Sequence, residues 1–384
     1  MFVLRGGTVV DADGRREADV AVEDGEITAV GDAPDDADEE INVGGQFVAP
    51  GLVDAHVHLM MDGRADPATV EGDGEAALAY RAAANLRDAL DAGVTTVRDL
   101  GAAGTVALDA GRAVERGVLE GPRVLACGQN VVMTGGHGHW FGREADGVPE
   151  VKKAVREQLK RGADVVKCMA TGGVLTEGAL TGAPELDEAE LEAVVSAAEA
   201  KRVPTAAHAH GTAGIKHAVR AGVSSVEHGT FMDREAAELM ADRGTYWVPT
   251  AKALYGIVDA GTEAGIPEFA VEKAEAAKEA WAEAFDHALD AGVDIAMGTD
   301  AGTPFNYHRD IPEELGLMVD HGLSERQALE AATVNAADLL GLDDVGTVSE
   351  GARADLVVLD DDPLSDVTAW QSPARVVRRG TAVR

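Results

Sequence analysis

Two histidines separated by one residue, His56 and His58, are the first residues in the chain that could do chemistry. They lie in Val53-Asp54-Ala55-His56-Val57-His58, a largely apolar segment typical of a β-strand. Side chains two residues apart on a strand point to the same side, and two imidazoles on one side can bind a single cation. The pair therefore predicts part of a metal site. A hydrogen-bonded pair of core histidines is the alternative.

Lys167 is the second chemical signal. It lies inside Val165-Val166-Lys167-Cys168-Met169, an apolar strand where a charged ammonium is costly to bury. A desolvated lysine tends to lose its proton, and a neutral amine can react with carbon dioxide to form a carbamate. Such a two-oxygen anion suits the bridging of two divalent cations about 3.5–4 Å apart. A structural ion pair of Lys167 with Asp99 or Asp300 is the alternative.

The middle of the chain supplies the strands that such residues need. Helical stretches end in glycine and are followed at once by a short apolar strand, as in Asp91-Ala92-Gly93-Val94 and Asp290-Ala291-Gly292-Val293. Glycine fits the left-handed position that ends a helix, and an apolar strand fits a buried parallel sheet. Helices are expected at 75–91, 187–201, 268–290 and 324–340. Strands are expected near 51–58, 94–99, 123–129, 163–169, 203–208, 223–228, 245–250 and 293–299.

Eight such units over residues 51–344 indicate an α/β fold, a TIM-like (β/α)₈ barrel. An open doubly wound sheet is the alternative, and the lack of a glycine-rich phosphate-binding motif after the first strand weakens it. Active sites of such barrels lie at the carboxyl ends of the strands. The residues expected there are His56, His58, Asp99, Lys167, His208 with His210, His228 and Asp300.

Both ends of the chain have a different pattern. Residues 1–48 alternate apolar and polar positions between turn signals such as Asp13-Gly14 and Asp24-Gly25, which is typical of antiparallel strands and hairpins. Strand-like sequence returns in Ala354-Asp355-Leu356-Val357-Val358-Leu359. We therefore expect residues 1–50 and 345–384 to form one small β-sandwich domain beside the barrel.

Composition excludes several classes of function. The 384 residues carry 68 acidic and 33 basic side chains, a net charge of -35, and only nine of the basic residues are lysines. Such a charge argues against binding to nucleic acid or to an anionic membrane. The acids are spread over the whole chain, a pattern that resembles proteins of salt-loving organisms. Two cysteines and no secretory h-region in the N-terminal segment favour a cytoplasmic protein.

The residue set resembles the amidohydrolase superfamily in its binuclear form with a carboxylated lysine. It comprises His56, His58, Lys167, His208, His228 and Asp300. The segments at 45–52 and 346–357 resemble the family's passages into and out of the barrel. The segments Ala170-Thr171-Gly172-Gly173, Ala207-His208-Ala209-His210-Gly211 and Val226-Glu227-His228-Gly229-Thr230 resemble the prolidase-like branch, whose members hydrolyse Xaa-Pro and other dipeptides or N-acyl amino acids.

The resemblance implies two divalent metal ions, with zinc expected and manganese or cobalt accepted by the same ligands. His56, His58 and Asp300 would bind the first ion, and His208 and His228 the second, with the Lys167 carbamate and a hydroxide bridging both. The hydroxide would attack the amide, and Asp300 would carry its proton to the leaving amine. Family members often associate, so a homo-oligomer is expected.

Substrate contacts are expected from loops. The segment Thr134-Gly135-Gly136-His137-Gly138-His139 follows the third strand, and in related enzymes a histidine of this loop contacts the substrate, so His137 and His139 are candidates. His210 beside His208 is a further candidate, either as support for the metal ligands or as a surface residue. Tyr255, His308 and Arg309 are candidates for binding a free carboxylate.

The sequence thus predicts a metal-dependent hydrolase of small amides, such as a dipeptide of the Xaa-Pro or Xaa-Lys/Arg type or an N-acyl amino acid. An imidazolonepropionase-like or other cyclic-amide hydrolase, which typically uses one metal, is the first alternative. A non-catalytic assembly protein on the same fold is the second, and the complete set of ligand residues argues against it.

Overall fold

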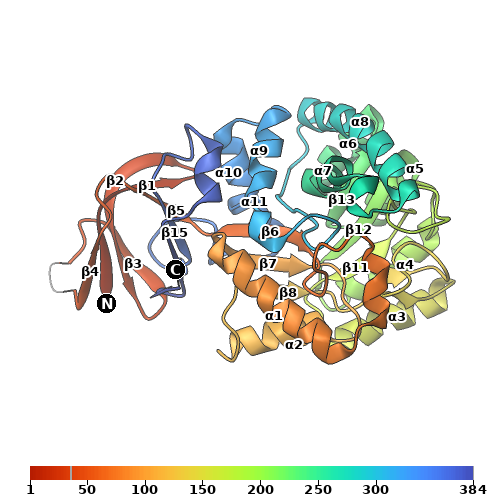
Figure 1. Ribbon diagram of the computed structural model, residues 1–384, viewed down its shortest axis with the longest axis horizontal. Helices are drawn as coiled ribbons and strands as arrows, with labels where there is room; N and C mark the ends of the chain where they lie inside the picture. Colours follow the sequence, from red (N-terminus) through yellow and green to blue (C-terminus); the bar gives the residue numbers. More distant parts are fainter. Residues whose placement is uncertain (35–36, 384) are drawn as a thin grey trace.

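The computed structural model describes residues 1–34 and 37–383. Figure 1 shows two parts: a group of strands that contains both termini, and a larger body in which helices surround further strands. None of the helices in the described part of the chain is long and apolar enough to cross a membrane.

Both ends of the chain build one sheet. Its order is β17-β16-β15-β5-β1-β2-β3, with β4 paired to β1. Strand β5 pairs with β1 on one side and with β15 on the other, so the C-terminal strands extend the N-terminal sheet. The bounds are β1 Phe2–Asp11, β2 Gly14–Glu23, β3 Glu26–Gly31, β4 Glu39–Asn42, β5 Phe47–Pro50, β15 Leu356–Leu359, β16 Arg375–Arg378 and β17 Thr381–Ala382.

The expected β-sandwich stays a prediction. Hydrogen bonds join all eight strands of the described termini into one sheet, which branches at β1 because β4 and β5 both pair with it. The sheet has a core of its own. Leu4, Val20, Val48 and Val358 are fully buried within one apolar cluster, so side chains from both ends of the chain pack together.

Parallel strands form the centre of the larger body. Strands β6 (Leu52–Val57), β7 (Val94–Asp99) and β8 (Arg123–Ala126) make a three-stranded sheet. The second sheet has the order β10-β9-β11-β12-β13-β14. Its strands are β9 Val131–Val132, β10 Arg143–Glu144, β11 Val166–Met169, β12 Thr205–Gly211, β13 Ser225–Phe231 and β14 Tyr246–Val248. Seven of the eight expected strands are therefore present.

The eighth expected strand, 293–299, is not a regular strand. It makes single parallel bridges instead, from Ile295 to Trp247 of β14 and from Ala301 to Val57 of β6. The backbone N–H of Ala55 donates to Met297 at 2.8 Å. At the other junction Asp164, just before β11, donates to Ala126 of β8 at 2.9 Å. Backbone hydrogen bonds therefore join both edge strands of the three-stranded sheet, β6 and β8, to elements of the second sheet or the segment beside it.

Helices cover these strands, and their buried faces follow the helical period. In α1 the residues Leu78, Ala82, Leu86 and Ala89 are buried, at intervals of three or four. The helices are α1 Glu75–Asp91, α2 Val106–Glu115, α3 Val148–Arg161, α4 Glu188–Glu199, α5 Thr212–Ala221, α6 Arg234–Arg243, α7 Ala251–Ala260, α8 Glu268–Ala291, α9 Glu313–Asp320, α10 Glu325–Ala331 and α11 Val334–Leu339.

Several helices end in glycine as expected, whereas one expected helix is divided into two. Gly162, Gly222 and Gly292 end α3, α5 and α8 in the left-handed conformation, with φ of 93°, 94° and 71°. The helix expected over 324–340 is divided into α10 and α11. The break lies at Thr333, whose φ of -133° and ψ of -90° are not helical.

Candidate metal centre

The first ligand group lies at the end of β6. His56 and His58 both direct Nε2 at Asp300, 3.3 Å and 3.2 Å from its Oδ1. The three residues are buried, and their ligand atoms lie within 4.8 Å of one another. Asp300 is held in place by its own backbone N–H, which donates to the His56 carbonyl at 2.7 Å. Burial opposes ionisation of Asp300, but the two imidazoles outweigh it and lower the pKa of the carboxyl.

A second group lies on the neighbouring strands. His208 and His210 on β12 and His228 on β13 are buried, with ligand atoms within 4.8 Å of one another. The Nε2 atom of His208 is buried without a hydrogen-bond partner among the described residues. The structure thus brings His208 and His228 together as expected, and it adds His210 to the same group.

Lys167 on β11 lies between these groups. Its side chain is 1% exposed, and its charge acts on His56 and Asp300 of the first group and on His208 and His228 of the second. Burial lowers the pKa of Lys167, which favours the neutral amine. Among the described residues Lys167 makes no ion pair within 4.0 Å, so the alternative of a structural pair with Asp99 or Asp300 gains no support.

The second nitrogen of four histidines is already engaged. Nδ1 of His56 bonds Glu227 Oε2 at 2.9 Å, and Nδ1 of His58 bonds the Gly101 carbonyl at 2.8 Å. Nδ1 of His210 and His228 lie 2.7 Å and 2.8 Å from the hydroxyls of Thr230 and Thr250. Such outer partners orient imidazoles for metal binding. The buried Nε2 atoms that remain, with one carboxylate, fit two divalent cations.

Glu227 is a functional residue that the sequence analysis missed. It is fully buried, bonds His56, and pairs with Arg98 Nη2 at 3.1 Å. Burial works against its ionisation, but Arg98 and His56 prevail and lower the pKa of Glu227 to about 2. Asp99, which follows Arg98 on β7, accepts from the backbone N–H groups of Leu59 and Gly101. A charged residue inside the apolar strand 225–231 was the available signal.

Asp54 is a second buried carboxylate that the sequence analysis did not select. It is fully buried on β6, and it accepts from the backbone N–H of His56 at 2.9 Å and from the hydroxyl of Thr299 at 2.6 Å. Burial raises the pKa of Asp54 to about 7. The residue ties the strand that carries His56 to the segment that carries Asp300, so it fixes the spacing of the first ligand group.

One cavity of about 680 Å³, partly open to solvent, contains both groups. Lys167, Asp300 and the histidines are the ionisable residues among its described lining. The remaining wall is largely apolar, with Thr250 and Thr303 as its polar members. Its apolar members are Met61, Trp140, Phe141, Met169, Val174, Leu175, Ala253, Leu254 and Ile257.

The loop histidines separate in the structure. His137 lines the cavity, its ring lies 4.4 Å from that of His208, and its Nδ1 is 2.9 Å from the Thr176 hydroxyl. His139 is outside the described lining, and its Nδ1 lies 3.0 Å from the Gly136 carbonyl of its own loop. Of the two, His137 is placed where a substrate could reach it.

The three candidates for carboxylate binding also lie outside the described lining. The Tyr255 hydroxyl bonds His321 Nε2 at 2.8 Å, and the Arg309 guanidinium stacks 4.5 Å from the Tyr307 ring. His308 is buried, and its Nε2 has no hydrogen-bond partner among the described residues. The geometry therefore gives none of them a contact with a molecule in the cavity.

Known proteins resemble the chain over nearly its whole length. The sequence profile described as the amidohydrolase family matches residues 47–383. Ochratoxinase of Aspergillus niger is 30% identical over 358 residues, which are 85% of this chain and 73% of that protein. A solved Xaa-Pro dipeptidase with methionine bound in its active site is 31% identical with a TM-score of 0.93. The match covers 100% of this chain and 99% of the dipeptidase chain. A solved prolidase complexed with N-methylphosphonate-L-proline is 32% identical with a TM-score of 0.94 and the same coverage.

Proposed function

The chain belongs to the amidohydrolase family, and on this premise we propose that it hydrolyses the amide bond of a small apolar dipeptide or N-acyl amino acid. It is a hydrolase of amide bonds, like the relatives it matches. One observation carries the finer proposal: two histidine groups flank the buried Lys167 at the floor of one cavity.

We assign His56, His58 and Asp300 to one divalent ion and His208 and His228 to another, with carboxylated Lys167 shared between them. Zinc is the expected metal, and manganese or cobalt would suit the same donors. When bound, the ions activate water and polarise the amide carbonyl. Asp300 is placed to accept the proton of the attacking water and to pass it to the leaving amine. The His210 ring lies 4.7 Å from that of His208 and lines the cavity, where it could contact a substrate or support the metal ligands.

The cavity wall narrows the choice of substrate. A cationic Lys or Arg side chain needs a carboxylate partner when it is buried, and Asp300 is the one carboxylate among the described lining. Because Asp300 belongs to the ligand set, a basic side chain would find no partner of its own. Apolar lining residues instead favour an apolar side chain or acyl group, and the neighbouring Xaa-Pro dipeptidase was solved with methionine bound. Xaa-Pro dipeptides and N-acyl derivatives of apolar amino acids are therefore proposed ahead of Xaa-Lys/Arg.

A substrate panel tests this proposal. Met-Pro, Leu-Pro and N-acetyl-methionine are compared with Ala-Lys, Ala-Arg and simple cyclic amides, in high salt, with metal content measured on the same preparation. Turnover of the apolar substrates at about two ions per chain supports the proposal. Preference for cyclic amides at about one ion per chain favours the cyclic-amide alternative. Full metal loading with no turnover of any amide favours the assembly protein.

The proposal extends to the architecture and setting. We infer that the parallel strands within residues 51–344 close into a (β/α)₈ barrel. The hydrogen bonds on both sides of the three-stranded sheet support this inference. Residues 1–50 and 345–384 then form the composite β domain. A cytoplasmic homo-oligomer from a salt-rich environment remains the expected form of the protein.

A further inference from the structure

A second, larger cavity lies away from the candidate metal centre. It has a volume of about 1220 Å³, partly open to solvent, and it shares no lining residue with the first cavity among the described residues. Helix α2, strand β8 and the residues around the C-terminal strand β16 enclose it. All four residues of β8, from Arg123 to Ala126, line this cavity, so it runs along β8. None of the candidate metal ligands lines it.

Arginine dominates the charge of this cavity. Five arginines line it, Arg112, Arg123, Arg353, Arg378 and Arg379, against three acidic residues, Glu115, Asp164 and Asp344. The whole chain has twice as many acidic as basic side chains and a net charge of -35. What each of these arginines pairs with therefore decides whether any of them is available to a ligand.

Ion pairs account for three of the five. Arg123 pairs with Asp344 at 3.0 Å, and Arg112 pairs with Asp109 at 2.9 Å. Arg353 Nε lies 2.6 Å from Asp355 Oδ2, an ion pair without hydrogen-bond geometry. These three arginines hold the walls of the cavity together.

Arg378 and Arg379 are different. Their side chains have no hydrogen bond or ion pair with the described residues, and Arg378 Nε is buried without a partner. Burial, followed by repulsion from Arg353, lowers the pKa of Arg378, and the nearby Asp355 opposes this shift only in part. Arg379 has φ of 47°, and its backbone N–H is fixed on Asp355 Oδ1 at 2.7 Å. Two guanidinium groups therefore face the cavity with donors to spare.

We propose that this cavity binds a small multivalent oxyanion, with Arg378 and Arg379 as its principal donors. The planar guanidinium fork matches two oxygens of a phosphate or a carboxylate. Such short bidentate contacts persist in concentrated salt, where long-range attraction is screened. The ligand would bridge the terminal sheet, through Arg378 and Arg379, to the parallel-strand body, through Arg123. Binding to the folded chain alone would raise its thermal stability.

Titration of the metal-loaded protein tests the proposal. Pyrophosphate and malonate are titrated separately by calorimetry at constant ionic strength set with KCl. The matched variants are Arg379→Gln, the double variant Arg378→Gln/Arg379→Gln, and Arg375→Gln. Arg375 lies on the same strand, is exposed, and is absent from the described lining, so it serves as the control.

Saturable binding with a 1:1 stoichiometry is expected for the wild type. Each lost charge-assisted hydrogen bond weakens binding about tenfold or more, so Arg379→Gln should raise Kd at least about tenfold and the double variant further. Arg375→Gln should stay within about twofold. Tighter binding of pyrophosphate identifies a phosphate-type ligand, and tighter binding of malonate a dicarboxylate.

Two results would overturn the proposal. One is the absence of saturable binding of either anion to the wild type. The other is unchanged binding to Arg379→Gln and the double variant, which would place the anion at the metal centre instead. Amide hydrolysis should be the same in all three variants, because none of these residues lies at the first cavity. If the wild type turned out not to hydrolyse amides, the anion-binding test would still stand, because it measures binding at the other cavity.

Discussion

Glu227 links the first ligand group to a buried positive charge. It bonds His56 through one carboxylate oxygen and Arg98 through the other, and the Ser225 hydroxyl also donates to it. A carboxylate behind a histidine fixes the orientation of the ring and raises its basicity towards a metal. The positive charge of Arg98 offsets the cost of burying the Glu227 carboxylate.

Glu227→Gln should therefore weaken metal binding at His56 and lower kcat/KM by about 10- to 100-fold. The substitution also leaves Arg98 buried without a charge partner, so thermal stability should fall. Steady-state kinetics, metal analysis and a thermal melt measure these effects. Ser225→Ala is the control, since it removes one hydrogen bond to Glu227 and keeps the carboxylate. Equal metal content and activity in the two variants would remove Glu227 from the site.

Lys167 gives the second prediction at this scale. Lys167→Ala removes the only amine that the described cavity lining offers for a carbamate. Hydrolysis should be lost, and metal content should fall from about two ions per chain to about one or fewer. Lys160→Ala on the exposed face of α3 is the control, and it should keep both. If hydrolysis and the second metal both survive in Lys167→Ala, the carbamate proposal is wrong.

The candidate ligands could be predicted from sequence because buried charge is conspicuous in an apolar strand. His56, Lys167 and His228 each stand at such a position, and the structure brings them under one cavity. Glu227 and Asp54 have the same signature but no obvious partner in the sequence, since Arg98 and Thr299 approach them only through folding. The candidates Tyr255, His308 and Arg309 were placed by order along the chain, which does not determine where a loop side chain points.

At the scale of elements, helix α8 holds a loop over the cavity. Lys273 of α8 donates from Nζ to the carbonyls of Thr176 at 3.0 Å and Ala179 at 2.7 Å. The same loop supplies Val174 and Leu175 to the apolar wall, and the Thr176 hydroxyl bonds His137. Lys273 therefore positions the part of the wall that would contact a substrate.

Lys273→Met should loosen this loop while it keeps the apolar stem of the side chain. Because the loop would contact a substrate and supplies none of the proposed metal ligands, KM should rise by about tenfold with a smaller fall in kcat. Lys278→Met on the same helix is the control, since Lys278 packs over Tyr255 outside the cavity. Kinetics of both variants on the best substrate of the panel measure the difference. An equal effect of the two substitutions would contradict the positioning role.

Element prediction succeeded where a local rule decides the outcome. The glycines that end α3, α5 and α8 are such a case, because the left-handed conformation suits glycine. The prediction of strands failed where a segment's pairing partners determine its structure. Segment 293–299 bridges β14 through Ile295 and bonds β6 through Met297, and so forms no continuous ladder. The pairing of β5 with both β1 and β15 likewise depends on partners far apart in the chain.

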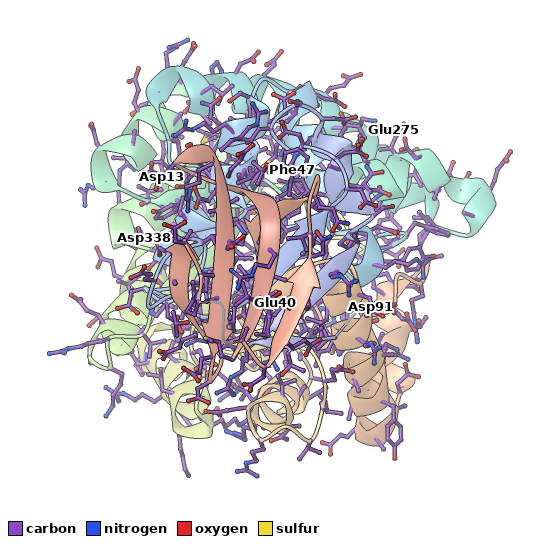
Figure 2. All side chains as sticks on the ribbon, turned by 90° about the vertical axis from the view of Figure 1, so that its left-hand side faces the viewer. Asp13, Glu40, Phe47, Asp91, Glu275 and Asp338 are labelled. Atoms are coloured by element: carbon purple, nitrogen blue, oxygen red, sulfur yellow. The ribbon has the colours of Figure 1, made fainter. Side chains whose placement is uncertain are left out.

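At the scale of the whole molecule, acidic side chains lie on both parts of the protein. Figure 2 views it from the side of the terminal sheet and labels five of these acids. They are Asp13, Glu40, Asp91, Glu275 and Asp338, which come from both the terminal sheet and the helical body. Among all the acids, Asp300 is the one assigned to the proposed reaction. The exposed acids among the others form a repulsive surface whose energy depends on the solvent.

Salt should therefore stabilise the fold. The Debye length falls from about 10 Å at 0.1 M to about 3 Å at 1 M, so repulsion among surface carboxylates is strong in dilute buffer and weak in concentrated KCl. Thermal melts across this range should show Tm rising with KCl, and sucrose at equal osmolality should not reproduce the effect. Hydrolytic activity should decline in parallel when salt is diluted.

A charge variant separates screening from other effects of salt. Glu272, Glu275 and Glu279 are exposed on α8 at spacings of three and four residues, where like charges repel one another. Replacing all three with Gln should raise Tm in dilute buffer, and the gain should shrink as KCl approaches 2 M. A gain that is independent of KCl would point to altered helix propensity. A wild-type Tm that does not change with KCl would contradict the proposal of a salt-rich environment, because the surface charge would then impose no measurable cost on the fold.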